Sequence, residues 1–306
     1  MHFVPVDPTQ LDTRLLALAD DSRAFYASRG DGRGPQSDVE VHRLREQRAA
    51  HPAPRDPRAV DLIAEWAGRS VPVRVITPTE PPRGAILSLH GGGFYFGSAA
   101  YDDVWNRELA DGLGVAVIGV DYRLAPENPW PAALDDCEVA ARWLIDYAPE
   151  EFGTDRLALM GFSAGSTLAM TTLLRLRDAG LAHRFCGAAL QFGTYDLSTT
   201  TPAGRMIADE YFLDAYLGHV DDRTPPDISP IFGDLHDLPP ALLVVGSDDI
   251  LVDDNRAMAT RLADAGNEVE LRVYPASPHG FTHHSTPTAA VARSDVAGWL
   301  STRLTG

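Results

Sequence analysis

The chain has 306 residues, of which 44% are hydrophobic and 23% charged, both close to the averages of folded globular proteins. This composition argues against an intrinsically disordered protein and against one that lies mainly within a membrane. The formal net charge of −17 disfavours nucleic acids and anionic membrane surfaces as partners, because both would be repelled.

All 26 basic residues are arginines, so chemistry that needs a lysine Schiff base or a lysine general base is excluded. The two cysteines, Cys137 and Cys186, predict buried thiols rather than a disulfide framework. Residues 1–10 lack a basic stretch followed by an apolar run, and no apolar run in the chain is long enough to cross a bilayer. We therefore expect a cytoplasmic protein without a membrane segment.

Two helical patterns open the chain. Residues 9–29 and 38–50 have the apolar spacing of helices, and the glycine-rich stretch 30–34 separates them. A proline-rich stretch at 52–57 follows. We expect residues 1–60 to form a helical cap segment outside the main sheet.

Residues 61–306 are predicted to form the larger domain. From residue 71 onward, short apolar runs alternate with longer helical patterns, which is typical of a mostly parallel sheet with crossover helices. Residues 196–238 interrupt this alternation and are predicted to be a cap insertion. The fold class is therefore α/β, with a mostly parallel central sheet flanked by helices and a small helical cap. The predicted strands are 71–77, 85–89, 115–120, 157–160, 188–192, 241–245 and 269–274, and the predicted helices are 101–113, 131–147, 163–179, 253–265 and 288–304.

A glycine-rich loop follows the predicted strand 85–89. Residues 90–94 are His-Gly-Gly-Gly-Phe. Glycines let a backbone approach a reacting carbonyl closely and point amide hydrogens at an oxygen that becomes negative. A phosphate-binding loop is the alternative, but the lysine and the serine or threonine that it needs are absent. We expect this loop to contribute to an oxyanion hole.

Ser163 lies in the sequence Gly161-Phe162-Ser163-Ala164-Gly165, between a predicted strand and a predicted helix. This spacing and context are typical of a nucleophile elbow, in which a sharp turn exposes a reactive serine. The alternative is a glycine-flanked serine that only caps a helix. The start of the helix also favours negative charge, so the amide of Ala164 is a candidate oxyanion donor.

A reactive serine needs a base and a carboxylate that orients the base. In sheets of this class the acid and then the histidine follow the nucleophile, on loops after later strands. Asp248 and Asp249 follow the predicted strand 241–245, and His279 follows the predicted strand 269–274. Both aspartates are candidates on this argument.

His283 and His284 lie close to His279 in the sequence. Two adjacent histidines without a cysteine or glutamate at ligand spacing are typical of a solvated turn rather than a metal site. We therefore expect no metal ion.

Five motifs together resemble the bacterial hormone-sensitive-lipase-like esterases of the α/β-hydrolase superfamily, over roughly residues 71–304. The motifs are HGGGF at 90–94, DYRLAPE at 121–127, GFSAG at 161–165, DILVD at 249–253 and HGF at 279–281. The resemblance implies an α/β-hydrolase catalytic domain at 61–306, no cofactor, and hydrolysis of carboxylic esters with short to medium acyl groups.

The resemblance also implies roles for individual residues. The acid of the family precedes a Pro-Leu-x-Asp pattern, and Asp249 fits that register whereas Asp248 does not. The implied roles are Ser163 as nucleophile, His279 as base, Asp249 as acid, and Gly92, Gly93 and Ala164 as oxyanion donors.

The chain departs from the family pattern near the site. Phe162 stands where the family most often has aspartate, and Ser166 and Ala276 stand where glycine is usual. None of these departures removes a catalytic group, but they leave the subgroup and the substrate open. Arg123 and Glu127 are implied to belong to a polar network behind the oxyanion loop.

Aromatic residues beside the motifs predict a partly apolar substrate pocket. A small-molecule ester with a short acyl chain is the expected substrate, because no mobile lid with extended apolar surface is evident.

Deacetylation of an amide or a sugar, or opening of a lactone, remains open as an alternative. A receptor on the same fold, like the plant gibberellin receptors, is disfavoured because such receptors have lost the histidine that His279 retains. A homodimer is a further hypothesis. The residues predicted to contact substrate are Phe94, Tyr95, Phe162, Tyr195 and Phe281.

Overall fold

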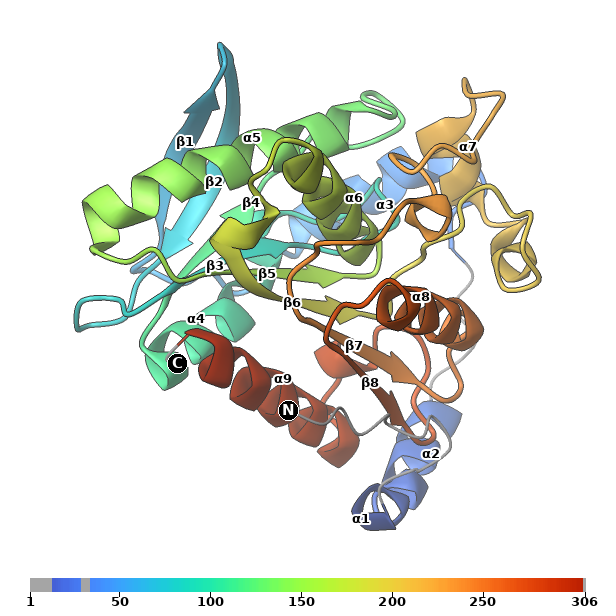
Figure 1. Ribbon diagram of the computed structural model, residues 1–306. Helices are drawn as coiled ribbons and strands as arrows, with labels where there is room; N and C mark the ends of the chain where they lie inside the picture. The colour runs from blue at the N-terminus through green and yellow to red at the C-terminus, as the bar shows by residue number, and fades with distance from the viewer. Residues whose placement is uncertain (1–12, 29–33, 305–306) are drawn as a thin grey trace.

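An eight-stranded sheet forms the centre of the molecule (Figure 1). The computed structural model describes residues 13–28 and 34–304, and within them the strand order is β1-β2-β4-β3-β5-β6-β7-β8. β2 is antiparallel to both β1 and β4, and the other neighbouring strands are parallel. The predicted α/β class with a mostly parallel sheet is confirmed. The strands are β1 (Val60–Trp66), β2 (Arg69–Ile76), β3 (Ala85–Leu89), β4 (Ala116–Val120), β5 (Leu157–Phe162), β6 (Phe185–Gln191), β7 (Ala241–Gly246) and β8 (Val269–Tyr274).

The seven predicted strands are all present, although the ends of several differ from the prediction by a few residues. Every residue of β3, β4, β5 and β7 is buried. Parallel strands are covered on both faces, which explains why these strands appear in the sequence as continuous apolar runs.

The strand β1 was not among the predicted strands. It forms a hairpin with β2 through Ala67 and Gly68, whose φ angles are 51° and 75°. As an edge strand it buries only Ala64, whereas Val60 and Ile63 are each 54% exposed. Val60, Leu62, Ala64 and Trp66 alternate with Asp61 and Glu65, so the strand has a local signal that the prediction missed, because it began the sheet only at residue 71.

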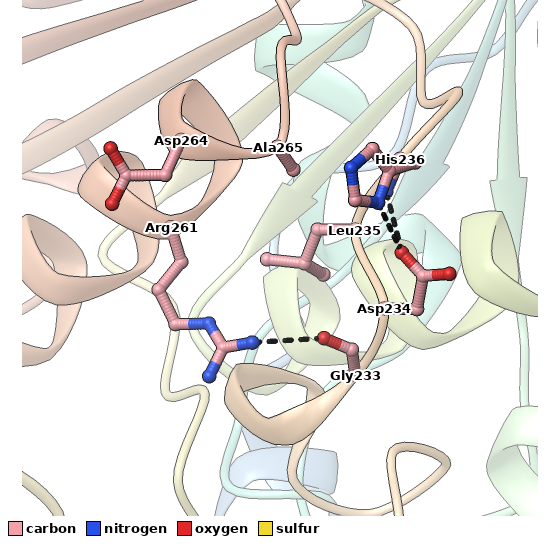
Figure 2. A pocket seen from close by; sticks show the side chains of 7 residues that line it. All are labelled: Gly233, Asp234, Leu235, His236, Arg261, Asp264 and Ala265. Atoms are coloured by element: carbon pink, nitrogen blue, oxygen red, sulfur yellow. Dashed lines mark hydrogen bonds and ion pairs between the residues drawn. The ribbon is translucent and has the colours of Figure 1, made fainter.

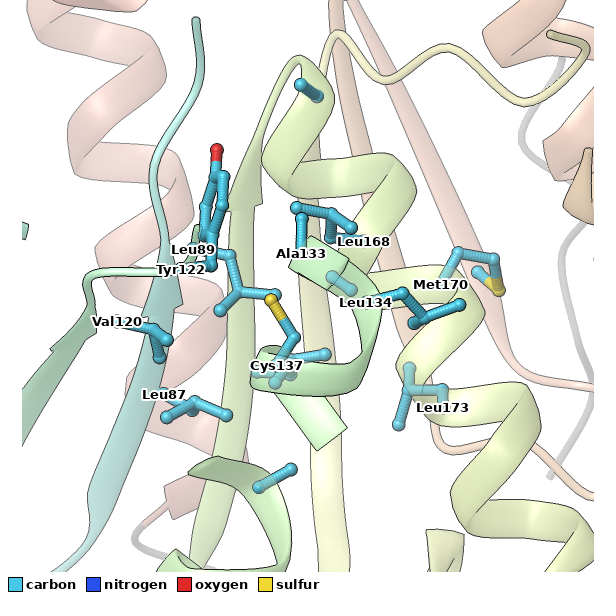
Figure 3. Packing of buried hydrophobic residues seen from close by; sticks show 14 of the residues in the cluster. Leu87, Leu89, Val120, Tyr122, Ala133, Leu134, Cys137, Leu168, Met170 and Leu173 are labelled. Atoms are coloured by element: carbon cyan, nitrogen blue, oxygen red, sulfur yellow. The ribbon is translucent and has the colours of Figure 1, made fainter. Parts of the chain in front are cut away.

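Helices cover both faces of the sheet, and successive strand residues face opposite layers. Leu87 and Leu89 of β3 belong to the core under α5 and α6, as Figure 3 shows, whereas Ile86 belongs to the core under α4 and α9. The five predicted helices are confirmed to within two residues, apart from a 3₁₀ turn at the start of the first. The helices are α4 (Asp103–Leu113), α5 (Ala132–Tyr147), α6 (Ala164–Asp178), α8 (Val252–Asp264) and α9 (Pro287–Leu304).

The N-terminal helices divide between two places in the molecule (Figure 1). The short α1 (Thr13–Leu16) and α2 (Ala19–Ala27) lie near α9, where the hydroxyls of Ser22 and Thr288 are 2.7 Å apart. The helix α3 (Asp38–Ala50) lies beside α7 (Tyr211–Leu217), and the hydroxyl of Tyr211 donates to the carboxylate of Asp38. The assignment of residues 1–60 to one cap segment stays a prediction, as does the boundary at residue 61.

The segment 196–238 contains 3₁₀ turns at Gly204–Ile207 and Pro230–Phe232, with α7 between them. Through α7 this segment contacts both α3, where Tyr211 bonds to Asp38, and the loop after β3, where Tyr216 stacks on Phe94. Its role as a cap insertion stays a prediction. None of the helices in the described part of the chain is long and apolar enough to cross a membrane.

Candidate active site

Ser163 lies between the end of β5 and the start of α6. Its backbone has φ 51° and ψ −119°, a conformation that an L-residue adopts only under strain. The flanking glycines are required by space: a Cβ on Gly161 would lie 2.4 Å from the carbonyl oxygen of Gly165, and one on Gly165 would lie 2.1 Å from that of Leu89. Gly161 is therefore required by the sharpness of the turn, and Gly165 by the close approach of the start of α6 to the end of β3.

Three side chains form one hydrogen-bonded line at this turn. The Oγ atom of Ser163 lies 2.8 Å from Nε2 of His279, and Nδ1 of His279 lies 3.0 Å from Oδ2 of Asp249. The ring of His279 is 41% exposed, whereas the carboxylate of Asp249 is fully buried. This arrangement can transfer the serine proton to an imidazole that a carboxylate orients.

The two candidate acids lie in different environments. Asp249 is buried, and its Oδ1 also accepts a hydrogen bond of 2.9 Å from the amide of Leu251. Asp248 is exposed, and its carboxylate accepts a hydrogen bond from the hydroxyl of Ser247. Only Asp249 faces His279.

The loop after β3 runs beside the serine because Leu89 pairs with Gly161 in the parallel register of β3 and β5. Gly92, Gly93 and Phe94 have φ angles of 127°, 59° and 63°, so three successive residues have positive φ. No main-chain acceptor within the described ranges takes a hydrogen bond from the amides of Gly92, Gly93 or Ala164. Unpaired amides beside a serine are the groups that an oxyanion hole requires.

His90 opens this loop and is buried against Tyr122, with ring centroids 4.1 Å apart. Burial lowers the pKa of His90, so its ring stays neutral at physiological pH. Its Nδ1 lies 2.9 Å from the carbonyl oxygen of Gly91, and the hydroxyl of Tyr122 donates to the carbonyl oxygen of His90 at 2.7 Å. These contacts give the base of the loop a rigid support.

The five aromatic residues predicted to contact substrate are all core side chains, with at most 8% of each residue exposed. Phe94 stacks on Tyr216 of α7 at a centroid distance of 4.0 Å. Tyr195 and Phe281 are fully buried. In the structure these side chains pack in the core. Their contact with substrate stays a prediction. The remaining members of this group are Tyr95 and Phe162.

Phe162, which stands where the family usually has aspartate, packs against His283. Their ring centroids are 4.8 Å apart, and Nε2 of His283 lies 3.3 Å from Oδ1 of the buried Asp102. His283 is therefore paired with a carboxylate rather than free in a solvated turn. Across residues 13–28 and 34–304, no group of three or more histidines, cysteines or acids is arranged to hold a metal ion.

Sequence reasoning missed two contacts of this region. One is the pair of His283 and Asp102, and the other is the contact of Arg45 with the carbonyl oxygen of Tyr95 at 2.9 Å. Neither has a local signal, because the partners come from distant parts of the chain.

A shallow hollow lies elsewhere on the surface, between the segment 233–236 and the end of α8 (Figure 2). Three of its polar side chains have partners within it: Arg261 donates to the carbonyl oxygen of Gly233, and His236 contacts Asp234. It contains none of the residues predicted for the site.

Residues 86–283 match the model of a family described as the alpha/beta hydrolase fold, which is well over half of the chain. The chain belongs to the α/β-hydrolase family. The predicted membership of this superfamily is thereby confirmed.

Individual relatives of this hydrolase are named as esterases. It is 32% identical to esterase LipI of Mycobacterium tuberculosis over 81% of this chain and 82% of that protein. It is 36% identical to an ethyl acetate hydrolase of Pseudomonas putida, over 70% of this chain and 72% of the relative. A solved esterase structure from Pyrobaculum calidifontis matches with a TM-score of 0.81 and 29% identity, covering 93% of this chain and 98% of the other.

Proposed function

We propose that this protein is a serine carboxylesterase that hydrolyses short- to medium-chain esters through an acyl-enzyme intermediate. The observation that carries the proposal is the continuous hydrogen-bonded line from Ser163 through His279 to Asp249. Its Ser163 end faces a loop with unpaired amides, and relatives named as esterases and as an ethyl acetate hydrolase support the same reaction.

In the proposed first half-reaction, His279 Nε2 takes the proton of Ser163 as Oγ attacks the ester carbonyl carbon. The carbonyl oxygen becomes an oxyanion that accepts hydrogen bonds from the amides of Gly92, Gly93 and Ala164. The tetrahedral intermediate then collapses, the ester bond breaks, and His279 gives its proton to the departing alcohol. Asp249 keeps the imidazole oriented and stabilises its charged form.

In the second half-reaction a water molecule replaces the alcohol. His279 accepts one proton of the water while the oxygen attacks the acyl carbon, and the same amides bind the second oxyanion. The proton returns to Ser163 when the acid leaves, so the enzyme ends in its starting state. No cofactor enters either step.

The same acyl-enzyme chemistry also fits an amide, a sugar acetate or a lactone, and these remain alternative substrates. The short-chain preference is supported by the closely packed aromatic residues beside the site and by the relative named for ethyl acetate. A cytoplasmic location and a homodimer stay predictions.

A panel of p-nitrophenyl esters from acetate to laurate tests the proposal. We expect butyrate to be hydrolysed faster than laurate, and Ser163→Ala to abolish hydrolysis while the circular dichroism spectrum and melting temperature stay close to those of the wild type, because only the attacking atom is lost. A fluorophosphonate should label the wild type at Ser163 and leave Ser163→Ala unlabelled.

Faster turnover of laurate would contradict the chain-length preference alone. Hydrolysis that survives in Ser163→Ala would contradict the proposed mechanism as a whole. A receptor would bind small esters without turning any of them over, so a lack of hydrolysis across the panel would favour that alternative.

A further inference from the structure

One arginine of α3 reaches the loop that carries the proposed oxyanion donors. Nε of Arg45 donates to the carbonyl oxygen of Tyr95 at 2.9 Å, and Nη2 donates to the carbonyl oxygen of Ala125 at 2.5 Å. Nη1 donates to the carboxylate of Glu127 at 2.6 Å. A single guanidinium therefore binds two segments that are far apart in the sequence.

These carbonyl groups belong to the two motif loops around the site. Tyr95 follows the glycines of the HGGGF motif, and Ala125 and Glu127 belong to the DYRLAPE motif. The two loops are also bonded to each other, because the amide of Ala125 donates to the carbonyl oxygen of Phe94 at 3.0 Å. Arg45 adds two charge-assisted bonds to carbonyls across the same junction, each stronger than a neutral hydrogen bond.

The oxyanion loop needs external support because its own backbone is unfavourable. Phe94 is a non-glycine residue with φ 63°, directly after two glycines of positive φ. The carbonyl oxygen of Gly92 accepts from the amides of Tyr95 and Phe96 and so closes the turn from one side. The carbonyl oxygen of Tyr95 is held from the other side by Arg45.

The helix that carries Arg45 is itself firmly placed. Its N-terminus has reciprocal capping bonds, in which Ser37 accepts from the amide of Glu40 and the carboxylate of Glu40 accepts from the amide of Gln36. Val41 is fully buried, and the guanidinium of Arg48 lies 4.0 Å from the centre of the Phe96 ring. Arg45 is thus a fixed anchor on a rigid element.

We propose that Arg45 is a positioning residue that holds the amides of Gly92 and Gly93 in the geometry that binds the oxyanion. On this inference α3, which lies outside the residues that match the family model, is part of the catalytic unit. The inference rests on the proposed ester hydrolysis. It predicts an effect on the transition state rather than on substrate binding, because the oxyanion exists only after attack.

The test compares Arg45→Gln with the wild type in kcat, KM, affinity for a trifluoromethyl ketone inhibitor, and free energy of unfolding in urea. A fluorophosphonate titration gives the fraction of active sites, so kcat is expressed per folded enzyme. We expect kcat on p-nitrophenyl butyrate to fall about ten- to a hundredfold, below the hundred- to thousandfold that loss of a whole donor costs. KM should change less than about threefold, and inhibitor affinity should fall in parallel with kcat.

Three further variants separate positioning from general stability. Arg45→Lys keeps a donor but not the planar fork, so it should recover part of the lost kcat. Glu127→Gln removes the carboxylate charge and leaves the two carbonyl bonds, so it should lower kcat clearly less than Arg45→Gln does. Arg43→Gln changes an exposed arginine on the same helix and serves as the matched control.

A kcat within about twofold of the wild type in Arg45→Gln would overturn the inference. So would equal losses in Arg45→Gln and Glu127→Gln, since the ion pair and not the carbonyl bonds would then matter. If the wild type hydrolyses esters and Arg45→Gln does so equally well, only the role of Arg45 fails. If the wild type hydrolyses none of the esters, the proposed function itself fails.

Discussion

Asp248 and Asp249 are neighbours in the sequence, but the turn after β7 gives them opposite environments. The carboxylate of Asp249 is fully buried and faces His279, whereas Asp248 is exposed and bonded to Ser247. A buried carboxylate in this place holds one tautomer of the imidazole and stabilises its charged form. The difference between the two aspartates can therefore be measured as a difference in rate.

We expect Asp249→Asn to slow ester turnover by up to about ten-thousandfold, because an amide group facing Nδ1 favours the wrong tautomer of His279. Asp248→Asn should lower kcat by less than about threefold, since exposed polar groups outside the hydrogen-bonded line contribute little. Steady-state kinetics on p-nitrophenyl butyrate measures both. Equal losses at the two positions would contradict the assignment of the acid.

At the scale of elements, α8 links the acid loop to the loop after β6. It begins three residues after Asp249 and carries the buried Asp254, whose Oδ2 accepts from the amide of Tyr195 at 2.6 Å. Burial raises the pKa of Asp254 to about 6, although hydrogen bonds from the amides of Tyr195 and Asp196 act in the opposite direction. The contact between α8 and the loop after β6 therefore contains a carboxyl group, Asp254, that titrates near pH 6.

The raised pKa makes stability depend on pH with a defined sign. The folded state binds the proton of Asp254 more tightly than the unfolded chain does. Its contribution to stability is therefore complete below about pH 4 and is lost as pH rises through about 6. Asp254→Asn lacks this titration. We expect the free energy of unfolding of the variant to rise relative to that of the wild type by about 2 kcal/mol between pH 4 and 6, out of about 3 kcal/mol over the whole titration, and the two to run parallel above pH 7.

Urea unfolding at a series of pH values checks this prediction. Asp253→Asn is the matched control, because the Asp253 side chain on the same helix is 70% exposed. The free energies of unfolding of Asp254→Asn and the wild type could instead differ by an amount that does not vary with pH, or that varies with the opposite sign. Either result would contradict the raised pKa of Asp254.

At the scale of the whole molecule, the net charge of −17 gives the protein as a whole a negative field. The field should attract cationic substrates and leave neutral ones unaffected. We expect kcat/KM for acetylcholine, relative to its neutral isostere 3,3-dimethylbutyl acetate, to fall several-fold as ionic strength rises from about 0.01 M to about 0.5 M. Over this range the screening length shrinks from roughly 30 Å to only a few ångströms. An identical salt dependence for the two esters would contradict the prediction.

Much of the fold was predictable because its signals are local. Apolar runs marked seven of the strands, and the Gly-x-Ser-x-Gly spacing around Ser163 is itself a local signal. The edge strand β1 was missed although Val60, Leu62, Ala64 and Trp66 alternate along it, because the predicted sheet began only at residue 71. Its place is decided by pairing with β2, which no short window of sequence shows.

The candidate site was predictable in its residue types and less so in its surroundings. The aromatic residues near Ser163 were expected to line a pocket, but the structure packs Tyr195 and Phe281 fully into the core. An aromatic side chain has the same pattern in the sequence whether it faces a substrate or a neighbouring helix. Only its packing partners distinguish the two.

The sequence by itself determined the sharp turn at Ser163, the glycine loop after β3 and the order of the chemical groups, because backbone sterics and apolar periodicity act over a few residues. Tertiary structure brought the carboxylate of Asp249, which the family register implied as the acid, opposite His279, and it alone decided that Arg45 of α3 reaches the carbonyl oxygens of Tyr95 and Ala125. Hydrogen bonds act over about 3 Å. Which distant segments come that close depends on how the whole sheet and its helices pack.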